Sequence, residues 1–477
     1  MHDPHQSLTH LTRRAILSRA AGGLGSIALG SLAGSEFATA GPSPAGWPGV
    51  IHPFHVPPRA KRVIWLYMAG GMSHLDTFDH KPKLAEMNGQ PMPESFTVGQ
   101  QLAQLQGQAL TCMAPQHAFG RAGQSGQEIS RIFPEVSARI ADRIAIVRSM
   151  HTEAINHDPA HTFMNTGSMI SGRPAAGSWL WYGLGTEAQD LPGFVVMVST
   201  GRFGQSQPIA SRQWHSGLLP SRFQGVEFRS KGDPVLYVNS PPGTSAGRQR
   251  DIIDAVSRLD TLRDTTVDDP EIAARLAQYE LAFQMQTSVP GLVDLSDESA
   301  ETFDLYGTRG GDGSFAANCL LARRLAERGV RFIQLYHRDW DHHGSVKEHI
   351  EGSAGEVDRG AAALVEDLAR RGMLDDTLIV FGTEFGRTPM AQGNGRDHHM
   401  KAFSIWLAGG GIRGGITYGA TDDLGYGIVE NPVTVHDLHA TILHLLGIDH
   451  TQLTIRAQGR DFRLTDVHGH VVHDLIG

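Results

Sequence analysis

Histidine and carboxylate side chains follow two apolar segments of this chain directly after each segment ends. The sequence HRDWDHHG at 337–344 contains Asp341 and His343, and the apolar run TLIVF at 377–381 is followed closely by Glu384. Imidazole and carboxylate groups without thiolates suit divalent ions such as Zn²⁺, Mn²⁺, Mg²⁺ or Ca²⁺. So many titratable groups in one short turn are hard to explain as solvated surface, and they indicate a metal site.

The same pattern recurs after other apolar runs, at 62–69 and 144–150, and again past the Gly/Asn loop that follows 377–381. The number of candidates is enough for two metal ions. The preferred metal ligands are His74, Asp76, Asp341, His343, Glu384, His398 and His399. The residues expected to act on substrate are Ser73, His157, His161 and Arg387.

Each group also has a plainer explanation. A Ser or Asp after a strand often caps the next helix, and this applies to the segment that contains Ser73 and Asp76. For the other groups the plainer explanation is that several of these residues cap helices or bind water. Such explanations fit single groups better than all of them together. The metal-site prediction requires these side chains to share one pocket.

The elements that must position these residues alternate between apolar strands and amphipathic helices. Strands are expected at 62–69, 144–150, 194–199, 330–336, 377–381 and 402–410, and helices at 132–141, 251–263, 270–286, 314–329, 348–371 and 435–447. This alternation predicts one doubly wound α/β domain, with a mostly parallel sheet, helices on both faces and long loop insertions. Ligands bind such sheets at the carboxyl ends of the strands, where the candidate residues lie.

Composition excludes several classes of protein. The chain has 477 residues and a net charge of -9, and this acidic balance argues against a nucleic-acid surface. Only two cysteines occur, so neither a disulfide scaffold nor a Cys-ligated zinc site is available.

The N-terminus resembles an export signal. Arg13 and Arg14 precede a small, Gly/Ala-rich apolar run, and Ala38-Thr39-Ala40 gives a cleavage pattern. We expect residues 1–40 to be a twin-arginine signal, 41–60 a linker and 61–477 the folded domain. The apolar run is shorter than the roughly 20 residues of a stable membrane span. The expected location is therefore periplasmic or secreted.

Several segments resemble one known family. GGMSHLDTFD, WDHHG, TLIVFGTEFGRTP, GRDHH and LAGGGIRGG are similar to the bacterial domain-of-unknown-function family DUF1501, over essentially the whole chain. That family is exported, and it has been placed in the alkaline phosphatase/sulfatase superfamily. The resemblance implies an alkaline-phosphatase-like α/β fold, but the family has no settled activity.

The resemblance assigns roles unevenly. The segment at 383–386 is similar to the superfamily's Ser-Asp-His-Gly, which makes Glu384 a metal carboxylate but puts Phe385 in place of a second ligand. Asp341 and His343 resemble the central ligand pair, and His398 or His399 a later ligand histidine. His157 stands where sulfatases have the formylglycine precursor. No such nucleophile is offered, and Ser73, Thr162 or a metal-bound water remain as alternatives.

Together these features predict an exported, metal-dependent hydrolase of sulfate or phosphate esters that lacks a formylglycine nucleophile. Its expected substrate is a small-molecule or glycan anionic ester. The alternative is a non-catalytic exported protein that binds a metal or an anion and keeps the superfamily fold. The sequence leaves the metal, the substrate and the oligomeric state open.

Overall fold

The computed structural model describes residues 47–232, 234–235, 246–267 and 270–477. The expected signal at 1–40 and the first part of the expected linker lie outside the described residues. From residue 47 the linker segment lies against the domain, where the backbone N–H groups of Val50 and Ile51 donate to the carbonyl of Gly183 at 2.9 and 3.0 Å.

One mostly parallel sheet forms the centre of the molecule, with strand order β12-β4-β11-β8-β1-β7-β5-β6 and β15 paired with β4. Only β11 runs against its neighbours, so the carboxyl ends of β1, β4, β5, β7 and β8 share one edge. The strands are β1 (Arg62–Met68), β4 (Ile144–His151), β5 (Phe194–Ser199), β6 (Val226–Arg229), β7 (Phe332–His337), β8 (Thr377–Gly382), β11 (Phe403–Ala408), β12 (Ile416–Tyr418) and β15 (Val433–Thr434).

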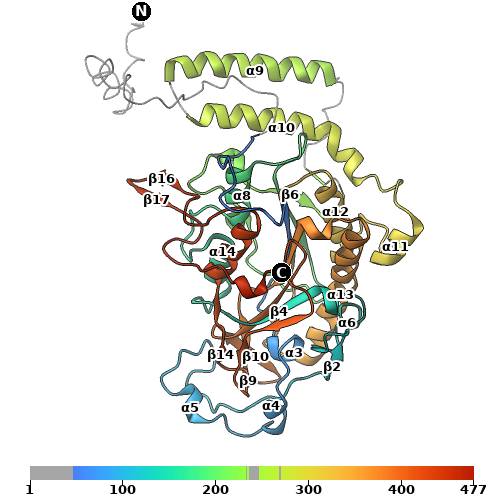
Figure 1. Ribbon diagram of the computed structural model, residues 1–477, viewed down its shortest axis with the longest axis vertical. Coiled ribbons are helices and arrows are strands. Elements are labelled where there is room, and N and C mark those ends of the chain that lie inside the picture. The colour runs from blue at the N-terminus through green and yellow to red at the C-terminus, as the bar shows by residue number, and fades with distance from the viewer. Residues whose placement is uncertain (1–46, 233, 236–245, 268–269) are drawn as a thin grey trace, which may run out of the picture.

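Helices cover both faces of this sheet because alternate residues of each strand face opposite ways. Ile64 and Leu66 of β1 pack with α6, α12 and α13, whereas Val63 and Trp65 pack with α7, α8 and α14. Figure 1 shows α12 and α13 on one side of the sheet and α8 and α14 on the other. These helices are α6 (Pro134–Arg139), α7 (His157–Thr166), α8 (Ala176–Leu184), α12 (Phe315–Glu327), α13 (Val346–Arg370) and α14 (Val435–Leu445).

Elements outside the central sheet and its covering helices lie at the two ends of the molecule. The long helices α9 (Ala246–Val267) and α10 (Pro270–Val293) lie at one end, and the hairpin of β9 (Gly386–Gln392) and β10 (Gly395–His399) lies with α3 (His74–Thr77) at the other (Figure 1). The remaining elements within the described residues are α4 (Pro82–Glu86), α5 (Glu94–Thr97), α11 (Ala300–Tyr306), β2 (Phe119–Ala122), β3 (Gln127–Ser130), β13 (Ala420–Thr421), β14 (Ile428–Glu430), β16 (Ile455–Ala457) and β17 (Arg460–Phe462), with five short 3-10 turns.

The doubly wound α/β fold predicted from the sequence is confirmed. Long stretches without strands or α-helices run over 98–118 and 200–225. The β9–β10 hairpin, near the candidate residues, is not among the predicted strands. Its strands carry charged residues and a proline and so lack an apolar strand pattern.

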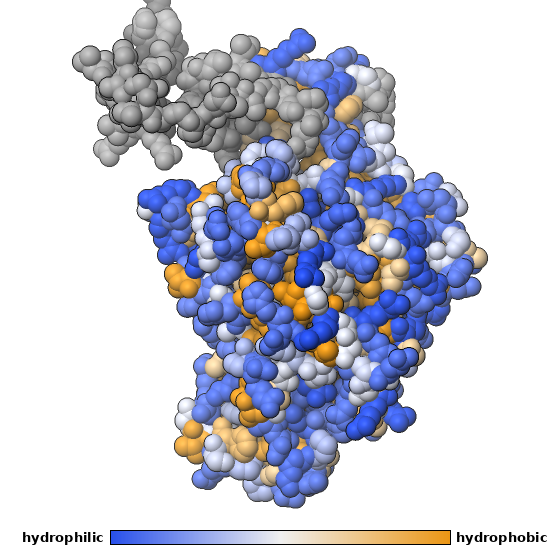
Figure 2. Space-filling view, in the orientation of Figure 1, coloured by the Kyte–Doolittle hydropathy of each residue, from blue (hydrophilic) through white to orange (hydrophobic). Residues whose placement is uncertain are grey.

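The surface shown in Figure 2 is predominantly hydrophilic, with hydrophobic residues in small groups. No helix within the described residues combines the length and the apolar character needed to cross a membrane.

Candidate metal centre

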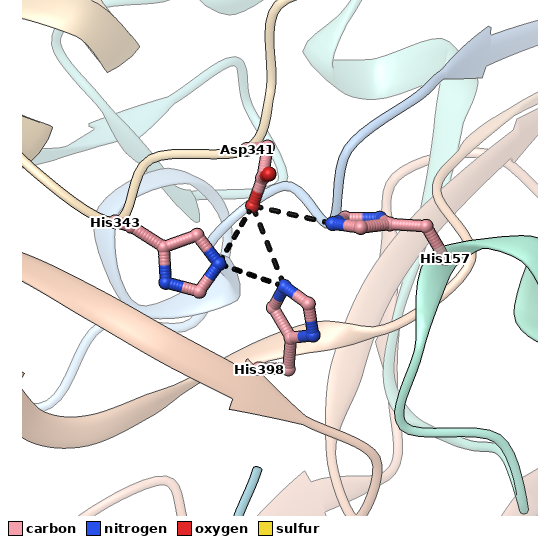
Figure 3. Close-up of side chains that lie close together, drawn as sticks. All are labelled: His157, Asp341, His343 and His398. Atoms are coloured by element: carbon pink, nitrogen blue, oxygen red, sulfur yellow. Dashed lines mark hydrogen bonds and ion pairs between the residues drawn. The ribbon is translucent and has the colours of Figure 1, made fainter. Parts of the chain in front are cut away.

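Three segments bring a carboxylate and three imidazoles together at the carboxyl edge of the sheet (Figure 3). Asp341 and His343 lie in the turn after β7, His398 lies near the end of β10, and His157 is the first residue of α7. Because β4 and β7 both end at this edge, residues nearly 200 positions apart in sequence become neighbours. The structure thus brings together three predicted ligands, Asp341, His343 and His398, with His157, which was expected to act on substrate.

The four ligand atoms are spaced as the ligands of one metal ion would be. Oδ1 of Asp341 lies 3.0 Å from Nε2 of His343, 3.3 Å from Nε2 of His157 and 3.4 Å from Nε2 of His398. The Nε2 atoms of His343 and His398 are 2.9 Å apart. Ligands about 2.0–2.1 Å from a tetrahedral Zn²⁺ are separated by about 3.3 Å. The donor set of three nitrogens and one oxygen fits such an ion.

The other nitrogen of each imidazole faces an acceptor. Nδ1 of His157 donates to Oε1 of Glu384 at 2.9 Å, and Nδ1 of His398 donates to the carbonyl of Ile155 at 2.8 Å. Nδ1 of His343 donates to Oε1 of Gln392. These bonds hold the proton on Nδ1 and leave the Nε2 lone pair facing the centre, as in metal-binding histidines. Two lone pairs 2.9 Å apart repel each other, and a cation between them would remove that repulsion.

Charge at the centre follows from burial and from these contacts. Burial opposes ionisation of Asp341, but the positive charge of Arg387, which donates to Oδ1 at 2.6 Å, helps to hold the pKa of its carboxyl well below the usual range. Burial lowers the pKa of His398 to about 4, and the nearby charge of Arg387 acts in the same direction. His398 is therefore neutral at pH 7 and keeps a lone pair for a metal.

Glu384, a predicted ligand, lies behind His157. Its side chain is fully buried and accepts the N–H of Gly70 at 3.0 Å and the hydroxyl of Thr383 at 2.9 Å. Burial raises the pKa of Glu384, but the nearby imidazoles outweigh burial and lower it to about 2. Glu384 is thus a charged group that orients His157.

His161 completes a second group of possible ligands with His157 and Glu384. Its Nε2 lies 3.6 Å from Oε1 of Glu384, and its Nδ1 lies 2.9 Å from the hydroxyl of Tyr67. This group shares His157 with the first, and the Nδ1 atom of His157 already faces Glu384. The geometry therefore favours a single ion at the first group.

The contacts of Arg387 differ from those expected of a residue that handles substrate. Its guanidinium is 1% exposed and donates to Oδ1 of Asp341 at 2.6 Å. Its other N–H groups donate to the carbonyl of Gly71 at 2.7 Å, of Arg396 at 3.1 Å and of Gly70. Because backbone carbonyls and Asp341 take up its donors, Arg387 fixes the strand-end loops and has little left to bind an anion.

Another predicted ligand, Asp76, forms a separate buried ion pair with Arg396, and the predicted Ser73 donates to the same carboxylate. Oδ2 of Asp76 accepts from Nε of Arg396 at 2.8 Å and from the Ser73 hydroxyl at 2.6 Å. Two charges without exposed surface require such partners. The structure therefore places Asp76 and Ser73 away from the four residues of the centre, in contact with Arg396.

His74 and His399 also lie away from the centre. Their Nε2 atoms donate to the carbonyls of Gly425 at 3.0 Å and Tyr426 at 2.6 Å, and their rings stack 6.4 Å apart. Adjacent residues of a strand face opposite ways, so His399 points away from the centre that His398 faces. The expectation of one shared pocket therefore fails for Ser73, His74, Asp76 and His399.

Sequence reasoning missed the side chains that support the centre. Gln392 holds His343, and Gln205 contacts the backbone of Asp341. Glutamine is common on surfaces, and no spacing rule marks either residue. Only the position of Gln392 close to the glycine turn at 393–395, in a hairpin that leads to His398, could have indicated its role.

One side of the centre is open to solvent. The exposed fraction of the side chain is 27% for His343, 24% for Asp341, 15% for His157 and 6% for His398. Structural zinc sites have four protein ligands, whereas catalytic ones have three and keep a fourth position for water or substrate. This partial exposure is consistent with access for a ligand from the side of His343 and Asp341.

The fold and the site define the chain as a doubly wound α/β protein with a candidate His₃Asp metal centre at the carboxyl edge of its sheet. The model of a family described as a protein of unknown function, DUF1501, matches residues 60–476. The chain belongs to this family.

Comparisons with individual proteins give weaker likenesses. No curated protein matches the sequence. The structure is similar to a crystal structure of Ps i-CgsB, with 11% identity, a TM-score of 0.36 and coverage of 82% of this chain and 72% of that chain. It is also similar to the PsFucS1 sulfatase from Pseudoalteromonas sp., with 10% identity, a TM-score of 0.33 and coverage of 82% and 68%. A protein in the alkaline phosphatase superfamily from Vibrio parahaemolyticus has 9% identity, a TM-score of 0.34 and coverage of 87% and 73%.

Proposed function

We propose that this chain is a metal-dependent hydrolase of sulfate or phosphate esters that binds one divalent ion through His157, Asp341, His343 and His398. The observation that carries the proposal is the convergence of three imidazole Nε2 atoms on one carboxylate oxygen, with an acceptor behind each imidazole. When bound, a divalent ion supplies a Lewis acid that polarises an ester oxygen.

The protein's own groups support direct hydrolysis by water. The hydroxyl of Ser73 donates to Asp76, and that of Thr162 donates to the carbonyl of Asp158 at 2.8 Å. Both residues are at most 2% exposed, so neither predicted hydroxyl is placed to attack a substrate. The substrate would approach from the open side, past His343.

The alternative is a protein that binds a metal or an anion without turnover. The engagement of Arg387 with backbone carbonyls favours it, because no guanidinium fork then remains at Asp341 to hold a tetrahedral anion. The partial exposure of Asp341 and His343 favours the hydrolase, since it gives a substrate access to the centre from that side.

A hydrolysis screen separates the two proposals. The metal-free chain would be supplied with Zn²⁺, Mn²⁺, Mg²⁺ or Ca²⁺ and assayed on generic sulfate and phosphate esters, beside Asp341→Asn and Asp158→Asn. Asp158 is a suitable control because it lies on the same helix as His157, but its exposed carboxylate pairs with Arg212. We expect metal-dependent turnover that is lost only in Asp341→Asn. Metal binding without turnover on any ester would favour the binding protein.

We also propose that the chain is exported through its twin-arginine segment to the periplasm or beyond. Replacing Arg13 and Arg14 with lysine should leave the chain in the cytoplasmic fraction of its bacterial host, as measured by fractionation and immunoblotting. Unchanged export of this variant would contradict the proposal.

A further inference from the structure

The turn that carries Asp341 is held by a segment from elsewhere in the chain. The side-chain amide of Gln205 contacts the backbone of Asp341 twice: Oε1 accepts the N–H of Asp341 at 3.0 Å, and Nε2 donates to its carbonyl at 2.9 Å. Two bonds from one planar amide to one residue fix both the position and the rotation of that residue's backbone.

The segment that carries Gln205 is itself anchored beside the centre. The carboxylate of Asp339 is fully buried; Oδ1 accepts the N–H of Gln205 at 2.6 Å, and Oδ2 accepts the N–H of Phe203. A Cβ atom on Gly201 would lie 2.3 Å from the Cβ of Asp339, so only glycine permits this approach. The segment and the Asp341 turn are therefore joined at Asp339 as well as at Gln205.

Asp339 has a backbone conformation that a side chain rarely adopts. Its φ is 87°, in the region that favours glycine. Its carbonyl accepts from Nε2 of His342 and from the hydroxyl of Ser353, both at 2.8 Å. Such conformations persist where surrounding contacts impose them, and they cluster at functional sites. Here the constraint turns the chain so that the backbone of Asp341 meets Gln205.

The same segment reaches the other side of the centre. Oε1 of Gln207 lies 3.4 Å from Nε2 of His161, which in turn lies 3.6 Å from Glu384, the residue that orients His157. Gln207 is 5% exposed. Residues 201–207 thus contact two of the groups that determine the shape of the centre.

We infer that Gln205 is a positioning residue of the metal centre, which directs the Asp341 carboxylate toward the three imidazoles by clamping the Asp341 backbone. This inference rests on the proposed metal centre and concerns metal affinity, not turnover. Outer partners that orient metal ligands typically contribute about 10- to 100-fold to affinity.

Gln213 provides a matched control on the same long loop. Its amide also makes two bonds to backbone: Oε1 accepts the N–H of Ala210 at 2.8 Å, and Nε2 donates to the carbonyl of Pro208 at 3.2 Å. Gln213 is fully buried, but it clamps loop residues and not a metal ligand. Its loss should affect the stability of the loop and leave the direction of Asp341 unchanged.

The test compares Zn²⁺ affinity and metal-free thermal stability in the full chain, in Gln205→Met and in Gln213→Met. We expect Gln205→Met to raise the Kd for Zn²⁺ by about 10- to 100-fold, with the Kd of Gln213→Met unchanged. The metal-free Tm should fall no further in Gln205→Met than in Gln213→Met. Gln205→Glu, which keeps the acceptor and loses the donor, should give an intermediate Kd.

Equal Zn²⁺ affinity in the full chain and Gln205→Met would overturn the inference and leave the metal centre standing. Equal losses of affinity in both methionine variants would also overturn it, because the effect would then belong to the loop as a whole. Should Gln205→Met fail to fold, an unchanged Kd in Gln205→Glu overturns the inference in the same way. An absence of Zn²⁺ binding in the full chain would instead overturn the metal centre, and this inference with it.

Discussion

His398 and His399 show how far one residue step changes a role. Both follow the same hairpin loop and both are buried, yet Nε2 of His398 faces Asp341 at 3.4 Å and Nε2 of His399 bonds the carbonyl of Tyr426 at 2.6 Å. Their residue type and spacing are equivalent in sequence. The alternation of a strand assigns one to the centre and the other to support of a loop.

We expect His398→Ala and His399→Ala to separate these roles. Loss of an outer partner weakens metal binding by up to about 100-fold. His398→Ala should weaken it more, because this variant removes a proposed ligand. His399→Ala should keep the metal and lose only stability. Calorimetric titration with Zn²⁺ and thermal unfolding of both variants would check this, and retention of full metal affinity by His398→Ala would contradict it.

Arg387 is expected to matter for stability. Arg387→Met leaves the carboxylate of Asp341 and three backbone carbonyls without their donor. Loss of one partner of a buried ion pair costs about 3–5 kcal/mol of unfolding free energy. Urea unfolding would measure it, with Arg212→Met as the control, since the exposed pair of Arg212 and Asp158 should contribute less than about 1 kcal/mol. A similar small loss in both variants would show that Arg387 is not the structural residue described here.

At the scale of elements, the sequence predicts the central strands and the main helices well. Near-continuous apolar runs such as Arg62–Met68 and Thr377–Gly382 are buried on both faces, so their pattern alone indicates parallel strands. The β9–β10 hairpin could not be predicted in this way. Its strands carry Arg387, Arg396 and Asp397, which are buried because each has a specific partner.

The candidate site residues also differ in whether the local sequence predicts their place. Candidate ligands that follow a parallel strand, such as Asp341 and His343, could be predicted because strand ends share an edge. Asp76 also follows a strand, but its place depends on Arg396, a residue 320 positions away whose buried charge requires a carboxylate. No local pattern contains that information, and so the sequence assigned Asp76 to the metal.

Asp76→Asn should therefore weaken the contact between α3 and β10 and leave the metal content unchanged. Removing the charge leaves Arg396 buried without its partner, which should lower the unfolding free energy by about 3–5 kcal/mol. The bound metal per folded chain should stay as in the wild type. A double variant with Arg396→Met should recover part of the loss, as a double-mutant cycle would show. Loss of metal from folded Asp76→Asn would restore Asp76 as a candidate ligand.

At the scale of the whole molecule, buried neutral histidines make stability depend on pH. His439 lies 1% exposed against Trp65, and Nε2 donates to the carbonyl of Met164 at 2.9 Å. Burial, with a smaller contribution from the charge of His436, lowers the pKa of His439 to about 3. Its usual pKa is about 6.5, so between pH 6.5 and 3 the unfolded chain binds the extra proton and the folded chain does not.

The contribution of His439 should consequently be present above pH 6.5 and be lost as the pH falls toward 3. Each such group adds at most about 1.4 kcal/mol of unfolding free energy per pH unit over this window. Urea unfolding of the wild type and of His439→Gln at several pH values would measure the slope. The variant should show the shallower loss on acidification, and equal slopes would show that His439 does not stay neutral in the fold.

The proposed centre holds one ion through three imidazoles and a carboxylate. The most direct measurement is X-ray absorption at the metal edge of the purified, metal-loaded chain, with the metal content determined on the same sample. We expect about one ion per chain, with three imidazole nitrogens and one oxygen at about 2.0–2.1 Å if the ion is Zn²⁺. A chain that binds no metal, or an ion with fewer than three imidazole ligands, would contradict the proposed centre.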